Sequence, residues 1–68
     1  LGQLDEARRL LSEAYRAKPD PEIAAHLGEV LWIQGERDEA RRLWREGLQR
    51  DPANETLRST LKRLKIRL

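Results

Sequence analysis

Side chains that could supply a nucleophile or a general base are scarce in this sequence. The aliphatic hydroxyl groups stand singly along the chain, at Ser12, Thr56, Ser59 and Thr60. A working nucleophile needs a base and an orienting group within hydrogen-bond reach, and only His26 could act as that base. Because His26 lies directly before Leu27 and Gly28, we expect it to be partly exposed and structurally neutral. We therefore predict no catalytic residue and no enzymatic activity.

Ligands for metals and cofactors are equally few. Closed metal sites take three or four ligands, most often Cys and His, whereas this chain has no cysteine and one histidine. Phosphate-binding loops gather several glycines around the anion. Here the glycines are dispersed, at Gly2, Gly28, Gly35 and Gly47. We predict no metal, no cofactor and no disulfide bond.

The charge of the chain becomes basic toward its end. The net charge is +2, and residues 55–68 carry five basic side chains against one acidic. The basic residues are Arg58, Lys62, Arg63, Lys65 and Arg67. They could follow phosphates, so binding of nucleic acid or another anionic surface is an alternative function. No aromatic residue accompanies them for base stacking, and a nucleic-acid partner is therefore not what we expect.

One segment of the sequence occurs twice. GQLDEARRLL at residues 2–11 recurs as GERDEARRLW at residues 35–44, with seven of ten positions identical after a shift of 33. The same shift relates Glu13 to Glu46 and Pro19 to Pro52. A period near 33 is typical of helical solenoids. The acidic residues early in DEARR, followed by arginines, indicate a solvated, salt-bridged helix surface.

Helix-breaking residues divide the chain into four predicted helices. These cover residues 3–17, 21–34, 37–50 and 54–67. Asp20 is expected to cap the second helix at its start, with Pro21 in its first turn, and Gly35 to end it. Asn54 is the expected cap of the last helix. Connections of two to four residues make consecutive helices antiparallel.

Apolar spacing predicts how these helices pack. The second helix is apolar around most of its circumference and must lie between neighbours. Small residues let helices approach closely, and large residues fill the spaces between them. The small residues on the facing stripes are Ala24, Gly28, Ala40 and Gly47, and the large ones are Leu31 and Trp44. In the last helix, one docking face is predicted from Leu57, Leu61, Leu64 and Leu68.

The sequence resembles the tetratricopeptide repeat (TPR) family. The residues at family positions are Leu27, Gly28, Leu31, Gly35, Ala40, Trp44, Gly47 and Pro52. The resemblance implies an all-α solenoid fragment of about four antiparallel helices, in helix-turn-helix pairs that form a right-handed superhelical stack. It implies one domain over 1–68: helix B of a truncated repeat at 2–20, a complete repeat at 21–54 and a C-terminal capping helix at 55–68.

The same resemblance implies a scaffold or adaptor that binds a protein or peptide partner in a concave groove. The implied partner-binding residues are Glu22, Ala25, Glu29, Trp32, Ile33, Arg63 and Arg67, and Ser59, Thr60 and Ile66 would line the last helix beside them. We expect Trp32 to anchor the partner, opposite the stripe that meets Trp44, with Arg63 and Arg67 as neighbours. The alternative is that Trp32 packs against the last helix near Leu57 or Leu61. A regulatory domain associated with an enzyme is a further alternative.

Residues 20–54 also resemble the C-terminal repeats of proteobacterial outer-membrane TPR lipoproteins, including adaptors of a periplasmic protease. That resemblance would place the chain at the periplasmic face of the outer membrane, and otherwise we expect the cytoplasm. No apolar run approaches the roughly 18 residues of a membrane span. The first helix would lack a preceding helix over Leu4, Ala7 and Leu11, which predicts self-association through this helix.

Overall fold

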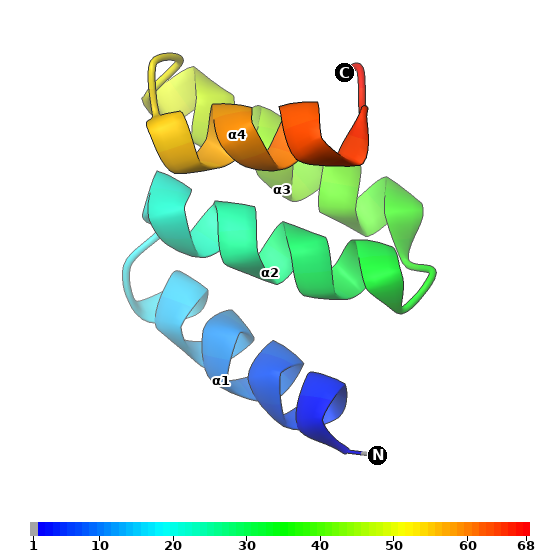
Figure 1. The fold of residues 1–68 in the computed structure, drawn as a ribbon. Coiled ribbons are helices and arrows are strands. Elements are labelled where there is room, and N and C mark those ends of the chain that lie inside the picture. Colours follow the sequence, from blue (N-terminus) through cyan, green and yellow to red (C-terminus); the bar gives the residue numbers. More distant parts are fainter. Residues whose placement is uncertain (1) are drawn as a thin grey trace.

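The structure is a computed structural model, and it describes residues 2–68. These residues form four antiparallel helices. They are α1 (Gln3–Ala17), α2 (Pro21–Ile33), α3 (Arg37–Arg50) and α4 (Glu55–Leu64). In Figure 1, α2 lies between α1 and α4, and α3 lies beside α2, behind α4. The predicted all-α, antiparallel architecture is confirmed. Leu1, the first residue of the predicted 1–68 domain, lies outside the described residues.

Side-chain caps begin two of the helices where the sequence predicts them. The carboxylate of Asp20 accepts a hydrogen bond from the backbone N–H of Glu22 at 2.8 Å, and Pro21 follows it in the first turn of α2. The amide oxygen of Asn54 accepts from the backbone N–H of Leu57 at 2.9 Å. Such caps satisfy backbone donors that have no partner inside the helix. The starts of α2 and α4 are therefore fixed by short, local sequence signals.

The end of α2 also follows its sequence signal. Gly35 has a φ of 89°, a conformation that favours glycine. The backbone N–H of Gly35 donates to the carbonyl of Trp32, and that of Glu36 donates to the carbonyl of Leu31 at 2.8 Å. These two bonds are those of a Schellman motif, which satisfies the last carbonyls of a helix. They end α2 at Ile33, one residue before the predicted end.

The last helix is shorter than predicted. It ends at Leu64 instead of residue 67, because Lys65 adopts the left-handed conformation with a φ of 58°. The N–H of Ile66 then donates to the carbonyl of Leu61 at 2.9 Å. This closing turn directs Ile66 back against the core. Leu68 is 43% exposed, so the predicted docking face holds for the helical leucines and is wrong for Leu68.

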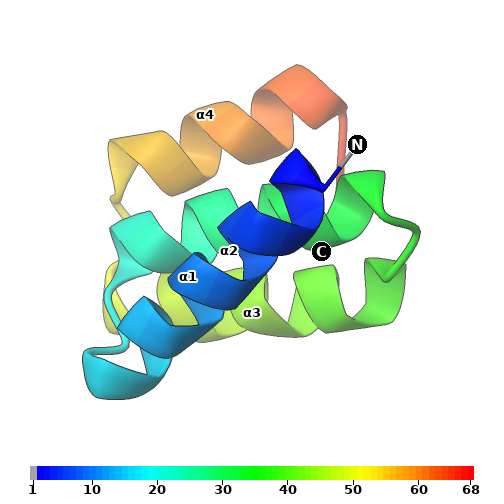
Figure 2. The same ribbon diagram turned by 90° about the horizontal axis from the view of Figure 1, so that it is seen from below.

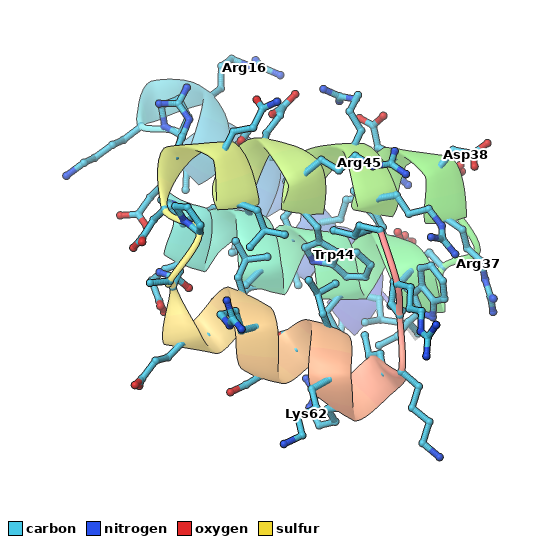
Figure 3. The ribbon with its side chains drawn as sticks, turned by 90° about the horizontal axis from the view of Figure 1, so that it is seen from above. Arg16, Arg37, Asp38, Trp44, Arg45 and Lys62 are labelled. Atoms are coloured by element: carbon cyan, nitrogen blue, oxygen red, sulfur yellow. The ribbon has the colours of Figure 1, made fainter. Side chains whose placement is uncertain are left out.

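The core is a layer of close contacts between large and small residues. Trp44 and Leu57 are the largest fully buried side chains, and Figure 3 shows the Trp44 ring directed from α3 into the interior. The indole of Trp44 lies directly over Gly28, and a methyl group of Leu57 lies over Gly47. The prediction that small residues let these helices approach is confirmed. Five residues of α2 are buried, as expected for a helix between neighbours: Ala24, Ala25, Leu27, Gly28 and Leu31.

Helix α1 forms an outer layer on α2, as Figure 2 shows from below. None of its residues is fully buried. Leu11 and Tyr15 pack against the core, and the Tyr15 hydroxyl donates to the Glu46 carboxylate on α3 at 2.8 Å. Leu4 and Leu10 are 42% and 52% exposed. The predicted self-association through this helix stays a prediction.

Candidate functional site

A stripe of three exposed residues and the partly buried Glu29 runs along α2. Its members, which we call the α2 stripe, are Glu22, His26, Glu29 and Ile33. They follow one another at intervals of four, three and four residues, which is the spacing of a single helix face. Ile33 is 57% exposed, a large fraction for an isoleucine. The stripe therefore offers carboxylates, an imidazole and an aliphatic side chain to a neighbouring molecule.

An ion pair joins the α2 stripe to α4. The guanidinium of Arg63 donates to the carboxylate of Glu29 at 2.7 Å, and this hydrogen bond raises the pKa of Arg63. The Arg63 side chain is 57% exposed, and exposed pairs contribute little to stability. The pair marks instead where the surfaces of α2 and α4 meet.

Trp32 lies at the edge of this surface, in contact with Trp44. The two ring centroids are 5.6 Å apart, with an angle of 39° between the ring planes. The expectation that Trp32 lies opposite the stripe that meets Trp44 is therefore wrong. The indole is partly buried and packs against the core cluster that includes Leu57. Its remaining exposed surface is available to a partner.

The arginines around Trp32 are not those expected. The Cζ atoms of Arg37 and Arg41 lie 4.4 and 5.4 Å from the Trp32 ring centroid. Arg63 pairs with Glu29, and the backbone carbonyl of Arg67 accepts a hydrogen bond from Arg41 at 2.8 Å. The predicted placement of Arg63 and Arg67 beside Trp32 is wrong: Arg63, within α4, is paired with Glu29, and Arg67 lies beyond the end of α4.

Two residues expected to line a groove are buried. Ala25 has no exposed surface, and its carbonyl lies 3.4 Å from the Trp44 ring nitrogen, which donates to it. Thr60 is 5% exposed, and its hydroxyl donates to the carbonyl of Thr56. These side chains are covered where the helices meet, so their expected exposure is wrong. Ser59 is exposed as expected.

Sequence reasoning missed three residues of this surface. His26 was assigned a structurally neutral role, although its spacing from Glu22 and Glu29 was sufficient to place it on their face. Arg37 and Arg41 belong to the next helix. They begin α3 directly after the turn at Gly35, so the predicted ends of the two helices were the signal that could have placed them near Trp32.

A second surface feature is a groove lined by residues of α1, α2 and α3, none of which belongs to the α2 stripe. Its volume is about 370 Å³, with Leu27, Leu31 and Leu43 among its lining residues. An ion-pair pattern occurs on both α1 and α3, and Glu39 and Arg42 of α3 also line this groove. Arg9 contacts Glu6 and Glu13, and Arg42, 33 residues later, contacts Glu39 and Glu46. The hydrogen bond from Arg42 lowers the pKa of Glu39. The predicted salt-bridged, solvated surface of DEARR is confirmed.

Residues 2–68 show neither a metal site nor a membrane-spanning helix. No group of three or more His, Cys, Asp or Glu side chains in this range could hold a metal ion. No helix among the same residues has the length and apolar character needed to cross a membrane.

Most of the sequence matches the model of a known protein family. Residues 21–64, more than half of the chain, match the family described as tetratricopeptide repeat. The chain belongs to the tetratricopeptide repeat family, whose members generally mediate protein–protein interactions. Comparisons with curated proteins and with solved structures gave no match. The resemblance to outer-membrane lipoproteins therefore stays a prediction.

Proposed function

We propose that this chain is the interaction module of a scaffold or adaptor, and that it binds a protein or peptide segment along α2 and α4. The observation that carries the proposal is the α2 stripe, which places the exposed Ile33 on one face with two carboxylates and His26. A polypeptide segment can match such a face with an apolar side chain and polar groups. Membership of a family of protein-binding repeats supports the same function.

The proposed contact residues are Glu22, His26, Glu29, Trp32, Ile33 and Arg63. Ile33 and the exposed part of Trp32 supply apolar contact, and tryptophan is among the residue types most often found to dominate binding energy. Glu29 and Arg63 add a pair of opposite charges where α2 meets α4. Ala25 is buried and is not part of the proposed surface.

Nucleic-acid binding by the basic last segment receives less support. Arg63 is already paired with Glu29. Lys65 and Arg67 lie beyond the end of α4, so they do not continue a basic face of that helix. A continuous row of unpaired cations is what phosphate binding would need. We therefore prefer a protein partner.

Selection of random displayed peptides against the immobilised chain tests the proposed function. Synthetic versions of the selected peptides are titrated into the labelled protein, and their binding is mapped by backbone amide shifts in NMR. We expect shifts along the α2 stripe and α4. Ile33→Asp should weaken binding about tenfold or more, because it places a charge in the apolar contact.

Leu10→Asp is the matched control for this experiment. Leu10 is 52% exposed on α1, close to the 57% of Ile33, so both changes add one exposed charge. Binding unchanged in Ile33→Asp and lost in Leu10→Asp would move the site to α1 and refute the proposal.

A further inference from the structure

The guanidinium groups of Arg37 and Arg41 are held on one aromatic ring. They lie one helical turn apart at the start of α3, and both approach the ring of Trp32, at 4.4 and 5.4 Å from its centroid. The same indole contacts the fully buried Trp44, with centroids 5.6 Å apart. Trp32 is thus supported by the core from within, and the two cations are positioned by the supported ring.

Stacking leaves the hydrogen-bond donors of these arginines available. A guanidinium stacks through its face, while its five N–H groups point outward in its plane. Arg41 uses one of them for the carbonyl of Arg67, at 2.8 Å. Arg37 makes no side-chain hydrogen bond with the described residues, and neither arginine has a carboxylate within ion-pair distance in residues 2–68. Arg63, by contrast, is already satisfied by Glu29.

We propose that Arg37 and Arg41 bind an acidic side chain of a partner polypeptide, next to an apolar side chain that contacts Ile33. This inference rests on the proposed function and names the chemistry of its partner. A guanidinium fork binds a carboxylate through two parallel hydrogen bonds, and fixing the fork in advance reduces the ordering cost of binding. Ile33 is the last residue of α2, four positions before Arg37, and is 57% exposed, so we expect it to provide the apolar contact.

A carboxylate fits this site better than a nucleic acid does. Base recognition by stacking needs an aromatic face that is free, whereas the Trp32 ring is in contact with two guanidinium groups and with Trp44. Glu36 and Asp38 flank Arg37 in the sequence, and Figure 3 shows Asp38 at the same end of α3. These acidic neighbours would repel an extended polyanion more than a single carboxylate, because a polyanion brings several negative charges close to them.

The peptides selected against the intact chain test this chemistry. We expect them to be enriched in Asp or Glu beside an apolar residue. Replacing that acid by its amide in a synthetic peptide should weaken binding about tenfold, as expected when a charge-assisted hydrogen bond is lost. Arg37→Ala and Arg41→Ala should each weaken binding by a similar factor, measured by fluorescence anisotropy of labelled peptides.

Two further variants separate binding from folding and from net charge. Arg37→Met keeps an unbranched side chain that can cover the Trp32 ring and removes only the donors, so it should melt like the parent and lose about tenfold in affinity. Arg16→Ala removes the same charge from an exposed residue of α1, which Figure 3 shows far from Arg37. Its affinity should stay within about twofold of the parent, because exposed charges farther apart than the screening length interact weakly.

The outcomes distinguish this proposal from the proposed function. The acidic-partner proposal would be overturned if Arg37→Met bound the peptides with the affinity of the parent, or if the selected peptides lacked acidic residues. In either case, Ile33→Asp would still test binding at the α2 surface. Failure to select any binding peptide would overturn both proposals. A single-stranded oligonucleotide could displace the peptides and lose its own binding in Arg37→Met. That result would show that the arginines bind phosphates, and it would overturn the acidic-partner proposal alone.

Discussion

The indole of Trp44 occupies the space in which a β-carbon on residue 28 would stand. Cε2 of Trp44 is 2.6 Å from the ideal position of that atom, and the ring nitrogen is closer still. Because Trp44 is rigid and fully buried, it cannot move aside. The absence of a side chain at Gly28 is therefore what allows α2 and α3 to approach.

Gly28→Ala should destabilise the chain more than Gly47→Ala. Overpacking against a rigid ring costs about 1–3 kcal/mol or more, which exceeds the ~1 kcal/mol that alanine gains over glycine in a helix. At Gly47 the nearest atom is a terminal methyl of Leu57, at 2.5 Å, which can rotate. Urea unfolding followed by circular dichroism measures both changes. Equal losses would show that the Trp44 ring yields as easily as the leucine methyl.

Trp44→Ala should cost more stability than Trp32→Ala. Removing a fully buried tryptophan costs about 3–5 kcal/mol, comparable to the whole stability expected of a core this small. Trp32 is only partly buried, so its loss should cost roughly half as much and leave a folded protein. Thermal melting of the two variants provides the comparison. Complete unfolding by Trp32→Ala would assign this residue to the core and remove it from the binding surface.

Lys65→Gly should stabilise the chain. Lys65 adopts a φ of 58°, which strains a residue with a β-carbon and not a glycine. We expect a gain of roughly 0.5–1 kcal/mol in the free energy of unfolding. Lys62→Gly, inside α4, is the control and should lose about 1 kcal/mol. If both changes destabilise, the turn that closes α4 does not form as described.

Tyr15 should make stability depend on pH in the alkaline range. Burial, together with the hydrogen bond to Glu46 and its negative charge, raises the pKa of the Tyr15 hydroxyl above its usual value of 10.0. A raised pKa stabilises the neutral form in the folded state. This contribution is complete below about pH 10 and is lost as the pH rises through the folded pKa.

The alkaline titration can be followed without a label, because Tyr15 is the one tyrosine in the chain. Absorbance at the tyrosinate band gives its pKa directly, and Glu46→Gln should bring that pKa closer to 10. Tyr15→Phe should remove this part of the decline in stability at high pH. A Tyr15 pKa at or below the ordinary value would contradict the contact between α1 and α3.

The sequence by itself determined the helices and the main contacts of the core. Asp20, Gly35 and Asn54 set helix ends through bonds to residues a few positions away, so their effect can be read locally. The pairing of Gly28 with Trp44 follows from facing stripes of small and large residues. These features depend on the helical period and on capping, which act over one or two turns.

Only the tertiary structure decided which side chains the surface presents. The helical period places Ala25 near the face of Glu29, but whether it is covered depends on how α4 lies against α2, and Ala25 is fully buried. The left-handed turn at Lys65 could not be predicted from a glycine, because none is present there. This turn ends α4 before Arg67. Arg37 and Arg41 reach Trp32 because the turn after Ile33 lays the start of α3 alongside the end of α2. Crossing geometry is set by the packing of whole helices, and no short stretch of sequence contains it.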